Sequence, residues 1–190
     1  EQAERQALTQ AARVHAPSRY TRDALVTRDG VSSRRISIVG LGVDPYIEPE
    51  VHAAQHPKAR SPRILYAGRL SDLKGTKVFF EAAARLLALE PEVHVDMVGG
   101  LPDNARAERR WRDQWLRCVE EVGSHRARWH GWQPRAALFE RFKEADLLVV
   151  PSLTETYGLT ALEAMSTGLP IVATPVGAMA DYITPRHGRL

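Results

Sequence analysis

Short apolar runs alternate with longer segments of helical periodicity between residues 62 and 190. The short runs predict strands at residues 63–67, 94–98, 127–130, 147–150 and 170–173. Apolar residues recurring three and four positions apart predict helices at 76–89, 105–122, 135–144 and 158–167. In the first helix, Val78, Ala82 and Leu86 share a face, with Phe79 and Ala83 beside them. This alternation predicts an α/β fold with a doubly wound parallel sheet, and the all-apolar run at 147–150 suits a strand covered on both faces.

Residues 1–43 follow a different pattern, which predicts a helix at 2–12, a strand at 13–16, a helix at 19–26 and a strand at 36–39. The stretch 44–61 is rich in proline and has no apolar period, so we interpret it as an interdomain linker. Residues 1–43 would then end an N-terminal domain, and 62–190 would form a second domain. We expect a fragment truncated at both ends, because such a fold needs further elements to close.

Composition narrows the class of protein. A chain of 190 residues with 44% hydrophobic content can fill one core. Only four of its 26 basic residues are lysine. Arginine binds phosphate and carboxylate well, so an anionic ligand would fit this bias. A compositional bias of the source genome explains it equally. No block of five basic residues occurs, so nucleic acid is not an expected partner. The single cysteine, Cys118, excludes a disulfide framework and favours a reducing compartment, and no apolar run is long enough to span a membrane.

The most informative segment is PSLTETYGLTALEAM at 151–165. It follows an apolar strand, and Gly158 stands where the next helix begins, which permits close approach of the backbone to a ligand. In a doubly wound sheet, ligands lie outside the carboxyl ends of the strands, and pyrophosphates lie at helix N-termini. The free amides of 157–160 would face such an anion, while Glu155 and Glu163 suit hydrogen bonds from sugar hydroxyls. The structural alternative makes Glu155 a helix cap and Glu163 a solvated surface charge.

A second segment, YAGRL at 66–70, is followed by Lys74 and Gly75. Gly68 closes the first strand of the second domain, and Arg69 and Lys74 stand in the loop before a helix. A guanidinium and an ammonium so placed can bind one diphosphate, unless they are merely two surface charges near a turn. Because both segments follow strand ends, we expect them to share one crevice.

These two segments resemble signatures of the large family four of retaining glycosyltransferases, which have the GT-B fold. Glu155 and Glu163, with the Gly-Leu pair and the Glu-Ala-Met run, resemble its paired-glutamate motif. Gly68-Arg69-Leu70 with Lys74-Gly75 resembles its diphosphate-binding loop.

The resemblance extends along nearly the whole chain. GLPIVATPVG at 168–177 is similar to the family's next strand and glycine turn, APSRY at 16–20 to the end of its N-terminal domain, and GVD at 42–44 to its crossover. Two positions depart from the pattern. Leu41 stands where Asn is usual, and Ala178 where a second Gly is usual.

The resemblance implies that the chain is the Rossmann-like, nucleotide-sugar-binding C-terminal half of a GT-B enzyme. The enzyme would transfer a hexose from a nucleoside-diphosphate sugar to an acceptor hydroxyl, with retention of configuration. Three residues receive catalytic roles: Arg69 and Lys74 hold the diphosphate, and Glu155 bonds hydroxyls of the sugar. Glu163 would bond the ribose. Further donor contacts are implied for Gly68, Tyr157, Gly158, Leu159, Thr160, Gly99, Gly131 and Trp132.

The resemblance also implies the partners. The acceptor would be a sugar or a lipid-linked glycan, with no cofactor and no metal, and the sequence has no Asp-any-Asp motif to clamp a metal. We expect a cytoplasmic location, and leave open peripheral membrane contact through the N-terminal domain. Two other functions stay open: a nucleotide-sugar-binding module without turnover of its own, and a GT-B sugar-nucleotide epimerase, which would need acid–base groups near the anomeric carbon.

We expect the remaining candidates to have no chemical role. His52 and His56 lie in the predicted linker without a carboxylate or thiolate partner, so no metal site is expected there. Packing roles are expected for His130, Trp111, Trp115 and Cys118.

Overall fold

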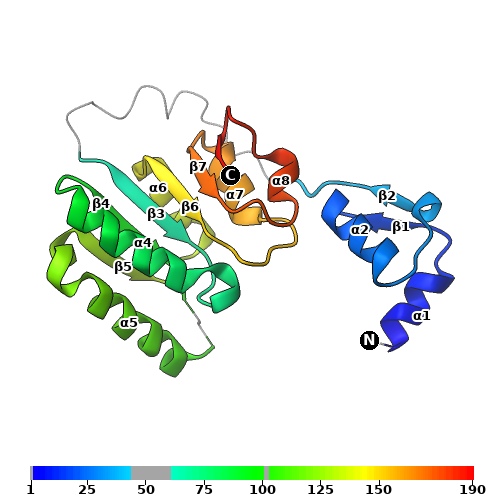
Figure 1. Ribbon diagram of the computed structural model, residues 1–190, viewed down its shortest axis with the longest axis horizontal. Coiled ribbons are helices and arrows are strands. Elements are labelled where there is room, and N and C mark those ends of the chain that lie inside the picture. The colour runs from blue at the N-terminus through cyan, green and yellow to red at the C-terminus, as the bar shows by residue number, and fades with distance from the viewer. Residues whose placement is uncertain (1, 44–60, 101–102) are drawn as a thin grey trace.

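The computed structural model describes residues 2–43, 61–100 and 103–190, and it contains two parts (Figure 1). We call residues 2–43 the N-terminal unit and residues 61–190 the sheet domain. A single connection leads from the end of the N-terminal unit past the C-terminal helix of the sheet domain.

The sheet domain is built on six parallel strands in the order β5-β4-β3-β6-β7-β8. They are β3 (Arg63–Ala67), β4 (His94–Val98), β5 (Ala127–Gly131), β6 (Leu147–Val150), β7 (Ile171–Ala173) and β8 (Gly188–Arg189). The order reverses between β3 and β6, where Leu65 pairs with Asp96 on one side and with Leu148 on the other. This reversal is the topological switch point at which doubly wound sheets bind ligands, and the predicted fold class is confirmed.

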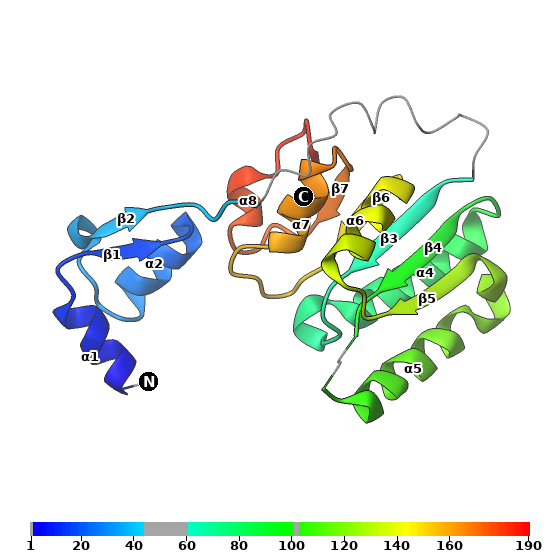
Figure 2. The same ribbon diagram turned by 180° about the vertical axis from the view of Figure 1, so that it is seen from behind.

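Helices cover both faces of this sheet (Figures 1 and 2). α4 (Thr76–Leu89) and α5 (Ala105–Gly123) lie on one face, and α6 (Arg135–Glu144), α7 (Leu159–Ser166) and α8 (Met179–Tyr182) lie on the other. In the described ranges, no helix is both long and apolar enough to cross a membrane.

Each face of the sheet has its own hydrophobic core. Successive residues of a strand point to opposite faces, so Tyr66 packs with Phe79 and Trp115, whereas Leu65 packs with Phe142 and Ala164. The packing role expected for Trp115 is confirmed, since its side chain is fully buried. Trp111 and Cys118 are partly buried against the same core.

The helices and strands predicted from the pattern are confirmed to within two residues at their ends, but α8, β8 and three short 3₁₀ helices among the described residues were not predicted. α8 and β8 contain four and two residues, too few to show a hydrophobic period. The buried face of α4 also differs from the face that its apolar periodicity predicts. Phe79, Phe80 and Leu87 are buried, whereas Val78 is 47% exposed, because α4 must pack against α5 as well as against the sheet.

The N-terminal unit holds α1 (Gln2–Gln10), β1 (Val14–Ala16), α2 (Arg19–Thr27) and β2 (Ile36–Ile38), as the sequence predicts. β1 and β2 form a parallel pair, and the Ser18 hydroxyl caps α2 by accepting from the amide of Thr21. The predicted linker at 44–61, with His52 and His56, lies outside the described residues except for Ser61.

A buried charge network joins the three strands at one edge of the sheet. Asp96, only 1% exposed, accepts from the Arg63 guanidinium at 2.5 Å and contacts Nε2 of His130 at 2.8 Å. Burial would raise the pKa of Asp96, but hydrogen bonds from His130 and Arg63 outweigh it and lower the pKa below its ordinary value. This contact gives His130 a structural partner, in line with the expectation of a packed or capping histidine.

Candidate functional site

The loop that follows β3 contains the two predicted cations, and we call residues 68–75 the basic loop. It contains one 3₁₀ turn, Asp72–Lys74, which the Ser71 hydroxyl caps by accepting from the amide of Lys74 at 3.2 Å. Thr76 accepts from the amide of Ser71 at 3.0 Å and shares a 3.0 Å hydrogen bond with the hydroxyl of Tyr66. Buried polar groups therefore fix the backbone that presents the cations.

The loop that follows β6 lies directly against the basic loop, and we call residues 151–158 the glutamate loop. The amides of Leu153 and Thr154 both donate to the carbonyl of Leu73, at 2.9 and 3.2 Å. Gly75 has a positive φ of 65°, and a Cβ added there would lie 1.8 Å from the carbonyl oxygen of Pro151. Only glycine allows this approach of two backbones, so the two loops act as one structural unit.

Glu155 is bound from both sides. Its Oε2 forms an ion pair with Nζ of Lys74, and its Oε1 accepts from the amide of Thr156 at 3.0 Å. The N-cap of α7 is Gly158, with a φ of 83°, so the interpretation of Glu155 as the helix cap is wrong. Lys74 and Glu155 come from loops 81 residues apart and meet at the switch point.

One pocket contains six of the predicted residues. Its lining consists of Tyr66, Ala67, Gly68, Arg69, Lys74, Val150, Pro151, Ser152, Glu155, Gly158 and Thr160. The expectation that the two sequence segments share one crevice is confirmed. Sequence reasoning missed Tyr66 and Ser152, which are 2% exposed and carry no signal that separates them from core residues.

The charge around this pocket suits an anion. The Arg69 side chain is exposed and, within the described part of the chain, has no ion-pair partner. The first amides of α7, at Leu159 and Thr160, lack intrahelical acceptors, and Thr160 lines the pocket. Among the described residues, no group of three or more His, Cys, Asp or Glu side chains could hold a metal ion. Two cations and a helix N-terminus fit a phosphate group.

A cluster of glycines lies next to Gly68, at the carboxyl ends of β3, β4 and β5. A Cβ at Gly99 would lie 2.1 Å from the carbonyl oxygen of Gly68, and the amide of Gly99 donates to the carbonyl of Gly131 at 2.9 Å. Trp132 is 56% exposed beside Gly100. Gly68 lines the pocket, whereas Gly99, Gly131 and Trp132 do not.

Glu163 lies outside this pocket. Its Oε1 contacts Nε of Arg135 at 3.2 Å, and 20% of its side chain is exposed, so it is not a freely solvated charge. The Arg135 guanidinium also lies 5.4 Å from the centre of the Phe139 ring. The structure therefore separates the two predicted glutamates: Glu155 lies in the loop before α7 and lines the pocket, whereas Glu163 lies on α7 and contacts α6.

Tyr157 was predicted as a donor contact, but its ring does not line the pocket. Its hydroxyl donates to the carbonyl of Leu41 at 3.0 Å. Its own carbonyl lies 2.9 Å from the hydroxyl of Tyr182, which lies equally close to the carbonyl of Gly158. Leu159, whose backbone was predicted to contact the donor, is the first residue of α7, and its side chain is 47% exposed.

Tyr182 on α8 and Gly177, two residues before α8, contact the glutamate loop. Burial, followed by the charge of Glu155, raises the pKa of Tyr182, so its hydroxyl stays protonated and donates. A Cβ at Gly177 would lie 2.0 Å from the carbonyl oxygen of Glu155, and the amide of Ala178 donates to Thr156 at 3.1 Å. The predicted glycine turn pointed to Gly177, but nothing in the sequence singled out Tyr182.

Comparison with known proteins agrees with this geometry. Residues 61–190 match the family model described as glycosyl transferases group 1. The chain is 32% identical to D-inositol 3-phosphate glycosyltransferases of Paenarthrobacter aurescens (strain TC1), over 97% of this chain and 46% of that protein, and of Nocardia farcinica, over 95% and 41%. It spans about half the length of the curated relatives it matches.

Solved structures share the fold. Sucrose-phosphate synthase from Thermosynechococcus elongatus superposes with a TM-score of 0.76 at 28% identity, over 97% of this chain and 46% of that one. Anabaena HepE in complex with UDP-glucose gives a TM-score of 0.72 at 20% identity, over 94% and 49%. Together with the family match over the whole sheet domain, this shows that the chain belongs to the glycosyl transferases group 1 family.

Proposed function

We propose that the protein transfers a hexose from a nucleoside-diphosphate sugar to an acceptor hydroxyl with retention of configuration. The sheet domain supplies the donor-binding half. The observation that carries this proposal is the pocket at the switch point, where Arg69, Lys74 and Glu155 meet at the N-terminus of α7. Family membership and the UDP-glucose bound by HepE support it.

Stabilising the leaving group is the main task of this half. Arg69, Lys74 and the first amides of α7 neutralise the diphosphate as the glycosidic bond breaks, because preorganised donors act strongly where charge develops. The acceptor hydroxyl is the nucleophile, and an oxygen of the departing phosphate takes its proton. No protein nucleophile is required.

Glu155 bonds hydroxyls of the donor sugar, assisted by the backbone of Tyr157, Gly158 and Leu159. Glu163 bonds the ribose hydroxyls. Gly99, Gly131 and Trp132 border the base, next to Gly68. The acceptor is a sugar or a lipid-linked glycan.

Incubation of the complete gene product with a panel of nucleoside-diphosphate hexoses and acceptors tests the reaction. D-inositol 3-phosphate belongs on the acceptor panel because the relatives' names specify it. Proton NMR of the product should show the donor's anomeric configuration, and transfer should persist in a chelator. Donor binding without product would favour the binding module, a free epimerised sugar nucleotide would favour the epimerase, and an inverted linkage would overturn retention.

Arg69→Ala and Lys74→Ala should each weaken binding of a nucleoside diphosphate by roughly tenfold to a hundredfold, since a charge-assisted hydrogen bond contributes about 1.5–3 kcal/mol. Binding of the bare nucleoside should hardly change. Calorimetry with both ligands measures the difference. Lys77→Ala is the matched control, because Lys77 lies three residues beyond Lys74 but pairs with Asp72 outside the pocket. Equal losses for nucleoside and diphosphate would remove either cation from the phosphate site.

A further inference from the structure

The glutamate loop touches the connection that leaves the N-terminal unit. After β2, the amide of Val39 still donates to the carbonyl of Ala16, and the chain then runs past α8 (Figure 1). There the Tyr157 hydroxyl donates to the carbonyl of Leu41 at 3.0 Å. A Cβ added to Gly40 would lie 2.9 Å from the same hydroxyl oxygen, so Tyr157 lies directly against this backbone. We call residues 39–43 the connector.

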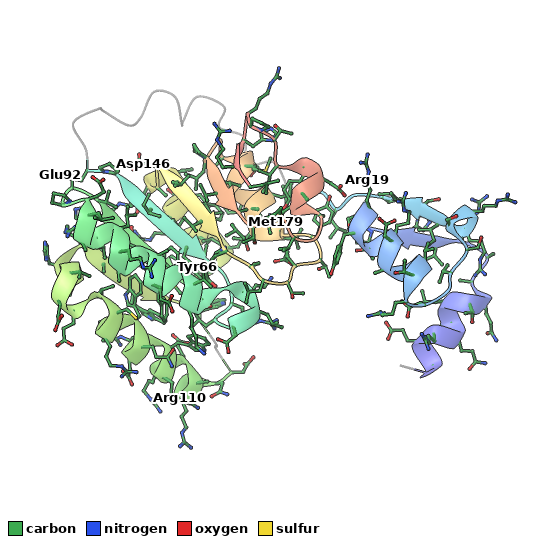
Figure 3. The ribbon with its side chains drawn as sticks, viewed as in Figure 1. Arg19, Tyr66, Glu92, Arg110, Asp146 and Met179 are labelled. Atoms are coloured by element: carbon green, nitrogen blue, oxygen red, sulfur yellow. The ribbon has the colours of Figure 1, made fainter. Side chains whose placement is uncertain are left out.

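A second contact lies close by. The amide of Arg19, at the start of α2, donates to Oδ2 of Asp181 on α8 at 3.3 Å. Figure 3 shows Arg19 on the side of the N-terminal unit that is nearest to α8. The residue that follows Asp181 is Tyr182, which binds the carbonyl of Tyr157. Both contacts from the N-terminal unit therefore lie at or next to Tyr157 and Tyr182.

Within the sheet domain, Tyr157 belongs to the loop that carries Glu155. The rings of Tyr157 and Tyr182 lie 5.8 Å apart, and the Tyr182 hydroxyl holds the carbonyls of Tyr157 and Gly158. Glu155 is two residues away, with its own carbonyl against Gly177. A movement of the connector that displaces Tyr157 must therefore either break these hydrogen bonds or move the loop.

We propose that Tyr157 is a positioning residue that couples the connector to the glutamate loop, so that the orientation of the N-terminal unit and the placement of Glu155 depend on each other. The inference rests on the proposed function, in which Glu155 contacts the donor sugar. The hydroxyl is the group that matters, because phenylalanine would keep the ring packing but could not donate to Leu41. Coupling of this kind is reciprocal: donor binding also biases the orientation of the N-terminal unit.

Tyr157→Phe in the complete gene product should lower kcat for transfer by about two- to tenfold, the range expected for one hydrogen bond. The Kd of the free nucleoside diphosphate should stay within twofold of wild type, because the phosphate contacts lie on other residues. Tyr20→Phe is the matched control, since Tyr20 is 48% exposed on α2 and its hydroxyl has no hydrogen-bond partner within the described ranges. Tyr182→Phe should behave differently and weaken diphosphate binding as well, because it releases the N-cap carbonyl of Gly158.

A distance measurement separates positioning from a local packing effect. Spin labels at Gln6→Cys on α1 and Arg110→Cys on α5 report the distance between the N-terminal unit and the sheet domain. Both sites are exposed. The background carries Cys118→Ala, with any other cysteine also replaced. In wild type and in Tyr20→Phe, the nucleoside-diphosphate sugar, added without an acceptor, should narrow the distance distribution, because its sugar contacts Glu155. In Tyr157→Phe, the unliganded distribution should be broader, and the ligand should narrow it less.

Three outcomes overturn the inference: a wild-type kcat in Tyr157→Phe, a lower kcat with unchanged distance distributions, or a parallel loss of diphosphate affinity. The third would place Tyr157 in the donor pocket itself. Failure of the proposed function is a separate result, because the wild-type protein would then neither bind the diphosphate nor transfer sugar. The unliganded distances of Tyr157→Phe would still test the contact between the connector and the loop.

Discussion

We expect Glu155→Gln to lower kcat for the proposed hexose transfer by about a hundredfold or more, on the scale measured for loss of one preorganised charge-stabilising group. The exchange keeps the shape of the side chain and removes its charge. That charge acts most strongly when the sugar ring becomes cation-like, and interactions that tighten only in the transition state raise kcat. Steady-state kinetics gives kcat, and calorimetry gives the Kd of the nucleoside diphosphate.

The same variant should bind the free nucleoside diphosphate as well as wild type or better, because it releases Lys74 from its ion pair. Glu163→Gln is the counterpart. It should weaken binding of the diphosphate itself, since its proposed partner belongs to the nucleoside, and it also leaves Arg135 without its carboxylate contact. Normal diphosphate binding in Glu163→Gln, together with its loss in Glu155→Gln, would reverse the two roles.

Gly75→Ala destabilises the sheet domain by about 3 kcal/mol and weakens diphosphate binding by about a hundredfold, since overpacking against atoms that cannot move costs about this much. The added methyl group would lie 1.8 Å from the backbone oxygen of Pro151. To avoid this overlap, the basic loop must move away from the glutamate loop, and this movement separates Lys74 from Glu155. Denaturant unfolding measures the free energy of unfolding, and calorimetry the affinity.

The control for this prediction is Gly30→Ala. Gly30 has nearly the same φ, 69° against 65°, but no atom lies within 4 Å of an added Cβ. The cost of the left-handed conformation alone is about 1 kcal/mol, so Gly30→Ala should lose that much and leave diphosphate binding intact. Equal destabilisation by the two substitutions would show that contact with Pro151 contributes nothing.

The fold was predictable because the strands of a sheet covered on both faces are apolar throughout, as at Leu147–Val150. The shared pocket was predictable for a topological reason: parallel strands place the loops after β3 and β6 at the same end of the sheet. α8 and β8 escaped prediction because elements of so few residues show no period. The buried face of α4 depended on packing against α5, which the sequence of α4 alone does not contain.

Pairings between distant segments could not be predicted. Nothing in the basic loop shows that Lys74 meets Glu155, and nothing in the sequence shows that Arg63 and His130 both contact the buried carboxylate of Asp96. Tyr157 stands between Glu155 and Gly158, both of which line the pocket, yet its side chain turns to the connector. The sequence indicates candidate residues for the chemistry, but side-chain direction depends on neighbours contributed by other parts of the chain.

The ion pair between Lys74 and Glu155 has a consequence for the end of each catalytic cycle. Without a ligand, the carboxylate of Glu155 stands in for the negative charge of the phosphate, and both side chains are mostly covered, at 27% and 13% exposure. The nucleoside diphosphate released in the proposed reaction would therefore compete with a tethered internal anion for the same ammonium group. This competition would lower its affinity and hasten its departure, the step that limits turnover in many enzymes. In the proposed enzyme, one carboxylate thus assists both the bond-breaking step and the clearing of the pocket for the next donor.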